Sequence, residues 1–137
     1  MSMFRIFEIA GSGMAAQSVR LNVTASNLAN ADMVAGSPGE VYRKRQPVFA
    51  TYMDPMRPDP ATAGVRVTNI STSSAQPQKN YEPGHPSANA EGYVYRANVD
   101  SVEEMVNMMS AARSYQNNIE ILNTTKELML RTLNMGR

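Results

Sequence analysis

Apolar residues recur at helical spacing at both ends of this 137-residue chain, while all eight prolines lie between residues 32 and 98. The terminal spacing predicts one helix from about Met3 to Ala31 and a second from about Val99 to Met135. At 1.5 Å per residue these helices would be roughly 45 Å and 55 Å long. Two helices of such similar length are expected to pair side by side.

The first helix carries a heptad-spaced apolar row that predicts its packing face. The row consists of Phe7, Met14, Leu21 and Leu28, and a flanking row on the same face consists of Met3, Ala10, Gln17, Thr24 and Ala31. Gly11 and Gly13 interrupt the helix, and each costs on the order of 1 kcal/mol relative to Ala. We therefore expect a kink, or a break before Met14.

The second helix carries two heptad rows that predict a partly polar seam. They are Val102, Met109, Gln116, Asn123 and Leu130, and Met105, Ala112, Ile119, Lys126 and Leu133. A third row of Met108, Tyr115, Leu122 and Met129 makes the helix apolar over more of its circumference than a two-stranded coiled coil covers. We expect a further partner to cover the remainder. Asp100 or Ser101 is predicted to cap this helix, and Gly136 to end it.

The middle of the chain, residues 32–98, is too long for a plain loop and should contain short strands. The candidates are residues 40–52, 64–72 and 92–96, whereas residues 54–63 and 71–79 have the composition of loops. The predicted fold is therefore mainly α with a small β region. Residues 1–31 and 99–137 form a coiled-coil-like inner domain, and residues 32–98 form a middle segment rich in β-hairpins.

Composition argues against several kinds of function. A net charge of +1 with 18% charged residues gives no electrostatic footprint for nucleic acid. No stretch approaches the roughly 20 apolar residues of a membrane span, so no direct lipid insertion is expected. Residues 1–13 make a poor signal peptide because Arg5 and Glu8 break the apolar run. His85, the only histidine, has no cysteine or clustered carboxylates adjacent in sequence, so we predict neither an enzyme nor a bound metal or cofactor.

One short segment concentrates basic charge at Arg43, Lys44 and Arg45. A solvated strand edge explains this cluster most simply, and contact with an acidic neighbouring subunit is the alternative. Glu103 and Glu104 point to different sides of a helix and are interpreted as first-turn charges that complement the helix dipole.

Three segments carry a family resemblance. The run GMAAQSVRLNVTASNLANAD, from Gly13 to Asp32, resembles the N-terminal signature of the bacterial flagellar axial proteins, which include rod and hook subunits. The run NVDSVEEMVNMMSAARSYQNNIEILNTTKELMLRTLNMG, from Asn98 to Gly136, resembles their C-terminal helix. YEPGHPSANAEGYVYRANVD, from Tyr81 to Asp100, is similar to the segment that enters this helix in a proximal rod member. The short chain also fits a rod subunit, because hook subunits carry larger insertions.

This resemblance implies a structural subunit of the flagellar basal body that polymerises through its terminal helices and transmits motor torque. Its implied partners are copies of itself, other rod subunits and the flagellar type III export apparatus, which would deliver it to the periplasm-spanning rod without a cleaved signal peptide. Asn27 and Asn30 would then hydrogen-bond across subunits, although a helix surface followed by a stop explains them equally well on physical grounds. The alternatives are another short rod subunit of the family and a soluble coiled-coil adaptor.

Overall fold

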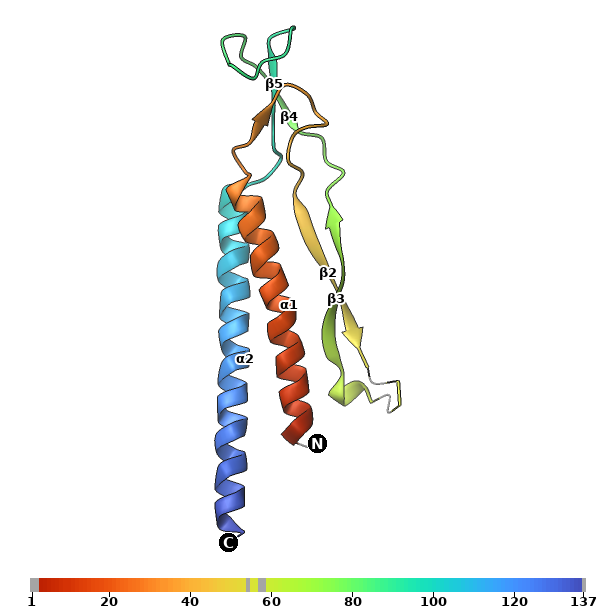
Figure 1. Cartoon of the computed structure of the whole chain (residues 1–137), viewed down its shortest axis with the longest axis vertical. Helices are drawn as coiled ribbons and strands as arrows, with labels where there is room; N and C mark the ends of the chain where they lie inside the picture. Colours follow the sequence, from red (N-terminus) through yellow and green to blue (C-terminus); the bar gives the residue numbers. More distant parts are fainter. Residues whose placement is uncertain (1–2, 54, 57–58, 137) are drawn as a thin grey trace.

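The computed structural model describes residues 3–53, 55–56 and 59–136, and its framework is two long helices. α1 (Met3–Ala29) and α2 (Ser101–Met135) lie side by side with opposite directions along the long axis of the molecule (Figure 1). The last turns of α2 extend past the start of α1. The two predicted terminal helices are therefore confirmed, and the coiled-coil character of their pairing stays a prediction.

Both helices are continuous, and local chemistry explains where α2 begins. Asp100 is its N-cap and accepts hydrogen bonds from the main-chain nitrogens of Val102 (2.8 Å) and Glu103 (3.2 Å). Gly136 follows the last helical residue as predicted. The break expected before Met14 is absent, since α1 runs unbroken through both glycines. Tertiary packing against α2 outweighs the low helix propensity of glycine here.

The middle of the chain forms two small antiparallel sheets. The strands are β1 (Val34–Ala35), β2 (Arg45–Tyr52), β3 (Gly64–Thr72), β4 (Gln78–Tyr81) and β5 (Tyr93–Arg96), with a 3₁₀ turn, η1 (Pro60–Thr62), before β3. β2 and β3 pair as a hairpin with a register shift between Val48 and Phe49, and the second sheet has the order β1-β5-β4. The predicted strand 64–72 is confirmed, and β5 fits the predicted 92–96. The loop expected at 71–79 is wrong at both ends, because β3 runs to Thr72 and β4 begins at Gln78.

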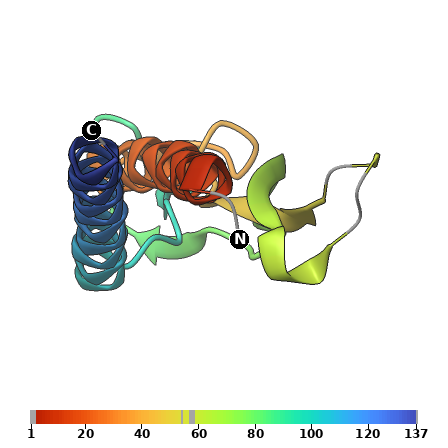
Figure 2. The same ribbon diagram turned by 90° about the horizontal axis from the view of Figure 1, so that it is seen from below.

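The β2–β3 hairpin lies along the side of α1 that faces away from α2, so α1 is the central layer of the molecule (Figures 1 and 2). Ser12 ties the two layers together, because its Oγ donates to the carbonyl of Ile9 (2.8 Å) and accepts from the main-chain nitrogen of Val65 (3.2 Å). A Cβ on Gly64 would lie 2.8 Å from the same Ser12 Oγ, so this close approach requires glycine.

The three-stranded sheet lies beyond the end of α1 and the start of α2, at the end of the helix pair opposite the chain termini (Figure 1). Its small core is made by Ala35, Val41 and Ala97, with Tyr42, Tyr95 and Val99 packed against them. Among the residues that the structure describes, no helix is long and apolar enough to cross a membrane.

Candidate assembly interface

The face of α2 that packs on α1, here called the inner face, includes a row of small and polar residues. Ala111 is completely buried, and Glu104 and Thr125 are also buried on this face. Gly13 of α1 lies so close to Asn118 that an added Cβ would meet the amide nitrogen of Asn118 at 2.9 Å. Small residues in this row thus let the two helix backbones approach closely.

The two predicted seam rows of α2 lie elsewhere, on a surface that we call the outer face. Its residues are Val102, Met105, Met109, Ala112, Gln116, Ile119, Asn123, Lys126, Leu130 and Leu133. All are exposed except the half-buried Ala112, and Val102, Met109 and Leu133 keep 65–66% of their surface. These rows therefore do not pack against α1 within one chain, and their predicted role as a helix seam or subunit interface stays a prediction. The inner face instead consists of the third row, Met108, Tyr115, Leu122 and Met129, and the row of Glu104, Ala111, Asn118 and Thr125.

The predicted row of α1 occupies an intermediate position. Phe7, Met14, Leu21 and Leu28 are all half-buried. The fully buried residues of α1 are mostly smaller, namely Ala10, Ala16, Val23, Thr24 and Asn27. Ala10 and Thr24 belong to the predicted flanking row, whereas Ala16, Val23 and Asn27 lie outside both rows. Because α1 lies between α2 and the hairpin, its buried residues face two layers.

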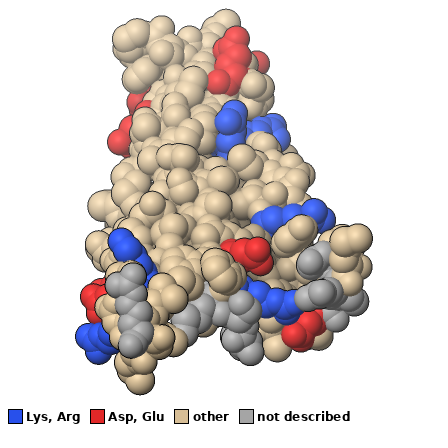
Figure 3. All heavy atoms as spheres, turned by 60° about the horizontal axis from the view of Figure 1, so that its bottom comes forward, with Lys and Arg blue, Asp and Glu red and all other residues tan. Residues whose placement is uncertain are grey.

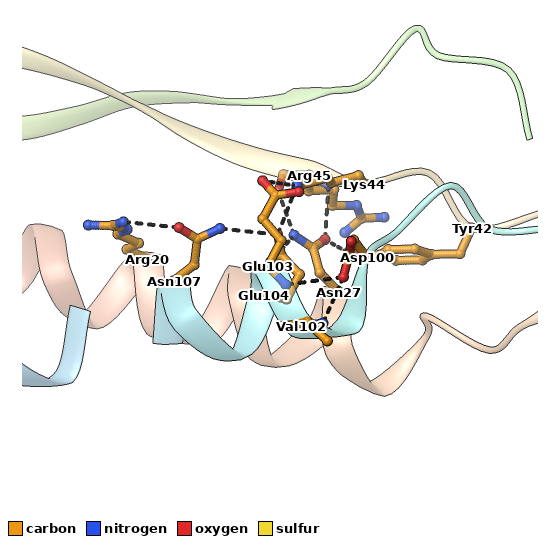
Figure 4. Close-up of polar contacts among 10 residues, drawn as sticks. All are labelled: Arg20, Asn27, Tyr42, Lys44, Arg45, Asp100, Val102, Glu103, Glu104 and Asn107. Atoms are coloured by element: carbon orange, nitrogen blue, oxygen red, sulfur yellow. Dashed lines mark hydrogen bonds and ion pairs between the residues drawn. The ribbon is translucent and has the colours of Figure 1, made fainter. Parts of the chain in front are cut away.

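Asn27 is the centre of a buried polar cluster where α1, α2 and the segment before β2 meet (Figure 4). Its side chain is 1% exposed, and its amide nitrogen donates to the Arg45 carbonyl (2.8 Å) and to Glu104 Oε2 (2.9 Å). Its amide oxygen accepts from the Tyr42 hydroxyl (2.8 Å) and from the Arg45 main-chain nitrogen (2.9 Å). All four bonds lie within the chain, and the bonding across subunits implied for Asn27 by the resemblance stays a prediction.

Lys44 completes this cluster. Its ammonium lies 3.0 Å from Glu104 Oε1 and 2.9 Å from Glu103 Oε1, and its side chain is only 13% exposed. Burial alone would lower the pKa of Lys44, but the hydrogen bonds and charges of Glu103 and Glu104 outweigh burial and raise this pKa above its ordinary value. The ion pair compensates the charge of the buried Glu104 carboxylate.

The structure also separates the members of the basic segment. Lys44 is engaged inside the chain, so the solvated-edge interpretation is wrong for this residue, whereas Arg43 and Arg45 are exposed. Glu103 and Glu104 do lie in the first turn of α2, as predicted. Asn30 donates from its amide to the Ser26 carbonyl (2.8 Å), which is a local bond at the end of α1. Sequence reasoning missed Glu104 and Tyr42 as structural residues, because no local pattern links Glu104 to Asn27.

Charged residues do not gather into a patch of one sign on the face seen in Figure 3, where Lys, Arg, Asp and Glu are interspersed. The residues that the structure describes contain no group of three or more His, Cys, Asp or Glu side chains arranged to hold a metal ion. The outer face of α2 remains as a surface on which several large apolar side chains are exposed.

Comparison with known proteins agrees with this arrangement. Residues 7–36 match the family model described as flagella basal body rod protein, and residues 90–135 match that of the flagellar basal body rod FlgEFG protein C-terminal region. The two matched segments contain most of α1 and α2. They define the class of the chain as a flagellar basal-body rod protein.

Relatives that match over their full length identify the family within this class. The chain is 56% identical to the flagellar basal-body rod protein FlgC of Salmonella typhimurium and 54% identical to that of Escherichia coli, in both cases over 137 residues and the whole of each chain. It is 40% identical to FlgC of Buchnera aphidicola subsp. Schizaphis graminum over 136 residues, 99% of each chain. The chain belongs to the FlgC family of flagellar basal-body rod proteins.

Proposed function

We propose that this chain is a structural subunit of the proximal rod of the flagellar basal body, and that it assembles through the outer face of α2. Its partners would be copies of itself and other rod subunits. Its role would be to carry motor torque towards the hook by tight packing, without catalysis. The full-length similarity to FlgC proteins supports the placement in a basal-body rod.

The observation that carries this proposal is the second, exposed apolar face of α2. Its inner face buries Glu104 and Thr125, while Val102, Met109 and Leu130 on its outer face stay 52–66% exposed. A helix normally turns its apolar side inward, so an apolar face left in solvent indicates a surface that a partner covers. Completing the burial of one such half-exposed side chain contributes on the order of 1 kcal/mol.

The angular spacing of the two faces supports a second helical neighbour. At about 100° per residue, the centres of the inner and outer faces lie roughly 100° apart around α2. One partner helix cannot cover both faces, because a two-stranded seam occupies only one of them. α1 takes the inner face, so the outer face remains for a helix of another subunit.

The Asn27 cluster would serve this assembly by fixing the subunit itself. A buried polar group that is satisfied in only one arrangement sets the register of paired helices. Asn27 and Glu104 would therefore hold α1 and α2 in one register and anchor the start of β2 to both. A torque-bearing subunit needs such a fixed geometry.

Delivery and location follow from the same proposal. The chain would pass through the flagellar type III export apparatus without a cleaved signal peptide and would join the rod in the periplasm. Export is separable from assembly, because a subunit with a defective outer face should still leave the cytoplasm.

The experiment compares two matched acidic substitutions in α2, Ile119→Asp on the outer face and Asn117→Asp two residues away on an exposed surface outside it. Each variant replaces the rod subunit in a strain that lacks its own copy. Ile119→Asp would bury an uncompensated charge in the assembly, so it should abolish swimming and remove the chain from purified basal bodies. Asn117→Asp should behave as the parent does. Normal basal bodies with Ile119→Asp would refute the proposed face.

A further inference from the structure

The outer face of α2 contains two exposed methionines, and we propose that they form an oxidation site that controls assembly. Met105 is 47% exposed and Met109 is 66% exposed. They are four residues apart in one helix, so their side chains lie next to each other. Val102 and Val106, exposed by 66% and 57%, flank them and complete an apolar surface around the two sulfur atoms.

The other methionines of the chain provide a natural contrast. Met108 and Met129 belong to the inner face of α2 and are half-buried. Met53 and Met56 are 45% and 91% exposed, but they follow β2 at the far end of the hairpin, away from α2 (Figure 1). Met33 (41%) and Met135 (87%) are also exposed, but neither belongs to the outer face. Among the exposed methionines that the structure describes, Met105 and Met109 are therefore the two on the outer face.

The reaction is oxygen transfer from hydrogen peroxide to a thioether. The sulfur lone pair attacks one peroxide oxygen, the O–O bond breaks, and the other oxygen leaves as water with both hydrogens. The sulfur is oxidised by two electrons to a sulfoxide, and the peroxide is reduced. The chain has no cysteine, so no thiol of its own competes for the oxidant.

The consequence of this oxidation rests on the function proposed above. A sulfoxide is a strong hydrogen-bond acceptor, and its burial between apolar helices without a donor costs free energy. Free subunits that are oxidised at Met105 and Met109 are therefore excluded from the rod. Assembly in turn covers these sulfur atoms, so subunits already in the rod are protected.

The test measures methionine sulfoxide in two pools of the same cells. Cells that carry the chain as their only copy of this rod subunit receive a pulse of hydrogen peroxide, and peptide mass spectrometry then compares purified basal bodies with the free chain. We expect the sulfoxide fraction at Met105 and Met109 to be at least about tenfold lower in basal bodies, equivalent to about 1.4 kcal/mol of lost assembly free energy. The fractions at Met53 and Met56 should differ far less between the pools.

Two double variants provide the second readout. Met105→Leu with Met109→Leu keeps the apolar volume and removes the sulfur atoms. Its yield in basal bodies after the pulse should therefore equal the yield of the same variant without peroxide. Met53→Leu with Met56→Leu should lose yield as the parent does. Equal sulfoxide fractions in both pools at Met105 and Met109, or equal sensitivity of all three chains, would overturn the inference. Absence of the chain from basal bodies without peroxide would instead overturn the proposed function, and the inference with it.

Discussion

Replacing Asn27 with alanine should destabilise the chain far more than the same change at Asn30, although the two residues lie one turn apart. Asn27→Ala removes four hydrogen bonds in a site that is 1% exposed. Glu104 keeps its ion pair with Lys44, and the Tyr42 hydroxyl still lies 3.2 Å from Ser26 Oγ. The main-chain N–H and C=O of Arg45 are the groups that lose their bonds to the amide.

The magnitude follows from those two main-chain groups. An unsatisfied buried donor or acceptor costs about 1–3 kcal/mol. The higher helix propensity of alanine offsets roughly half a kcal/mol of this loss in the free energy of unfolding. The net loss in the free energy of unfolding should be about 3 kcal/mol. Asn30→Ala removes one bond to the Ser26 carbonyl at a helix end, so its cost should stay below about 1 kcal/mol.

The assay is urea unfolding of the purified chain, followed by circular dichroism, with the parent and both variants at the same concentration. Equal slopes against urea would show that the variants unfold from comparable native states. Asn27→Asp supplies a further check, because it keeps the shape but places a carboxylate beside Glu104, and it should be no more stable than Asn27→Ala at neutral pH. A loss below about 1 kcal/mol for Asn27→Ala would refute the structural role given to the cluster.

Two further predictions concern the same helices. Lys44 has a raised pKa in the folded chain, so its stabilising contribution is fully present below its ordinary pKa of about 10.5 and is lost as pH rises through the higher folded value. Lys44→Met should therefore lower the free energy of unfolding at pH 8 by about 3 kcal/mol. Urea titrations at increasing pH should show this difference from the parent shrink once the pH exceeds the ordinary pKa of Lys44. Gly11→Ala should raise the melting temperature, because an added Cβ meets nothing within 4 Å and alanine favours the helix by about 1 kcal/mol. Gly13→Ala should gain less, since its Cβ must displace Asn118; equal gains would contradict the close helix approach.

Helical periodicity was sufficient to predict the two helices and the composition sufficient to predict a β-containing middle. The limits of α1 and α2 differ from the predicted ones by about two residues, and β3 coincides with its predicted range. These elements follow from local patterns, namely apolar spacing, the Asp100 cap and alternation in Val65 and Val67. The resemblance at both ends of the chain also anticipated the family.

Periodicity could not identify which partner each face of α2 meets. The sequence contains several heptad rows, and periodicity alone favours the rows with the largest apolar residues as the packing face. The structure places α1 against the row of Glu104, Ala111 and Asn118, because small side chains permit the closest helix approach and Asn27 satisfies the buried carboxylate. Contacts between residues 77 positions apart, such as Asn27 with Glu104, leave no local signal in one sequence.

The most direct test of the proposed assembly uses a single cysteine at the centre of the outer face, which the absence of native cysteine makes possible. Met109→Cys would be labelled with a maleimide in the free chain and, separately, in purified basal bodies. Position 109 is 66% exposed in the free chain, so rapid labelling there and strong protection in basal bodies is the predicted result. Equal labelling in both states would show that the outer face stays in solvent and would contradict assembly through α2.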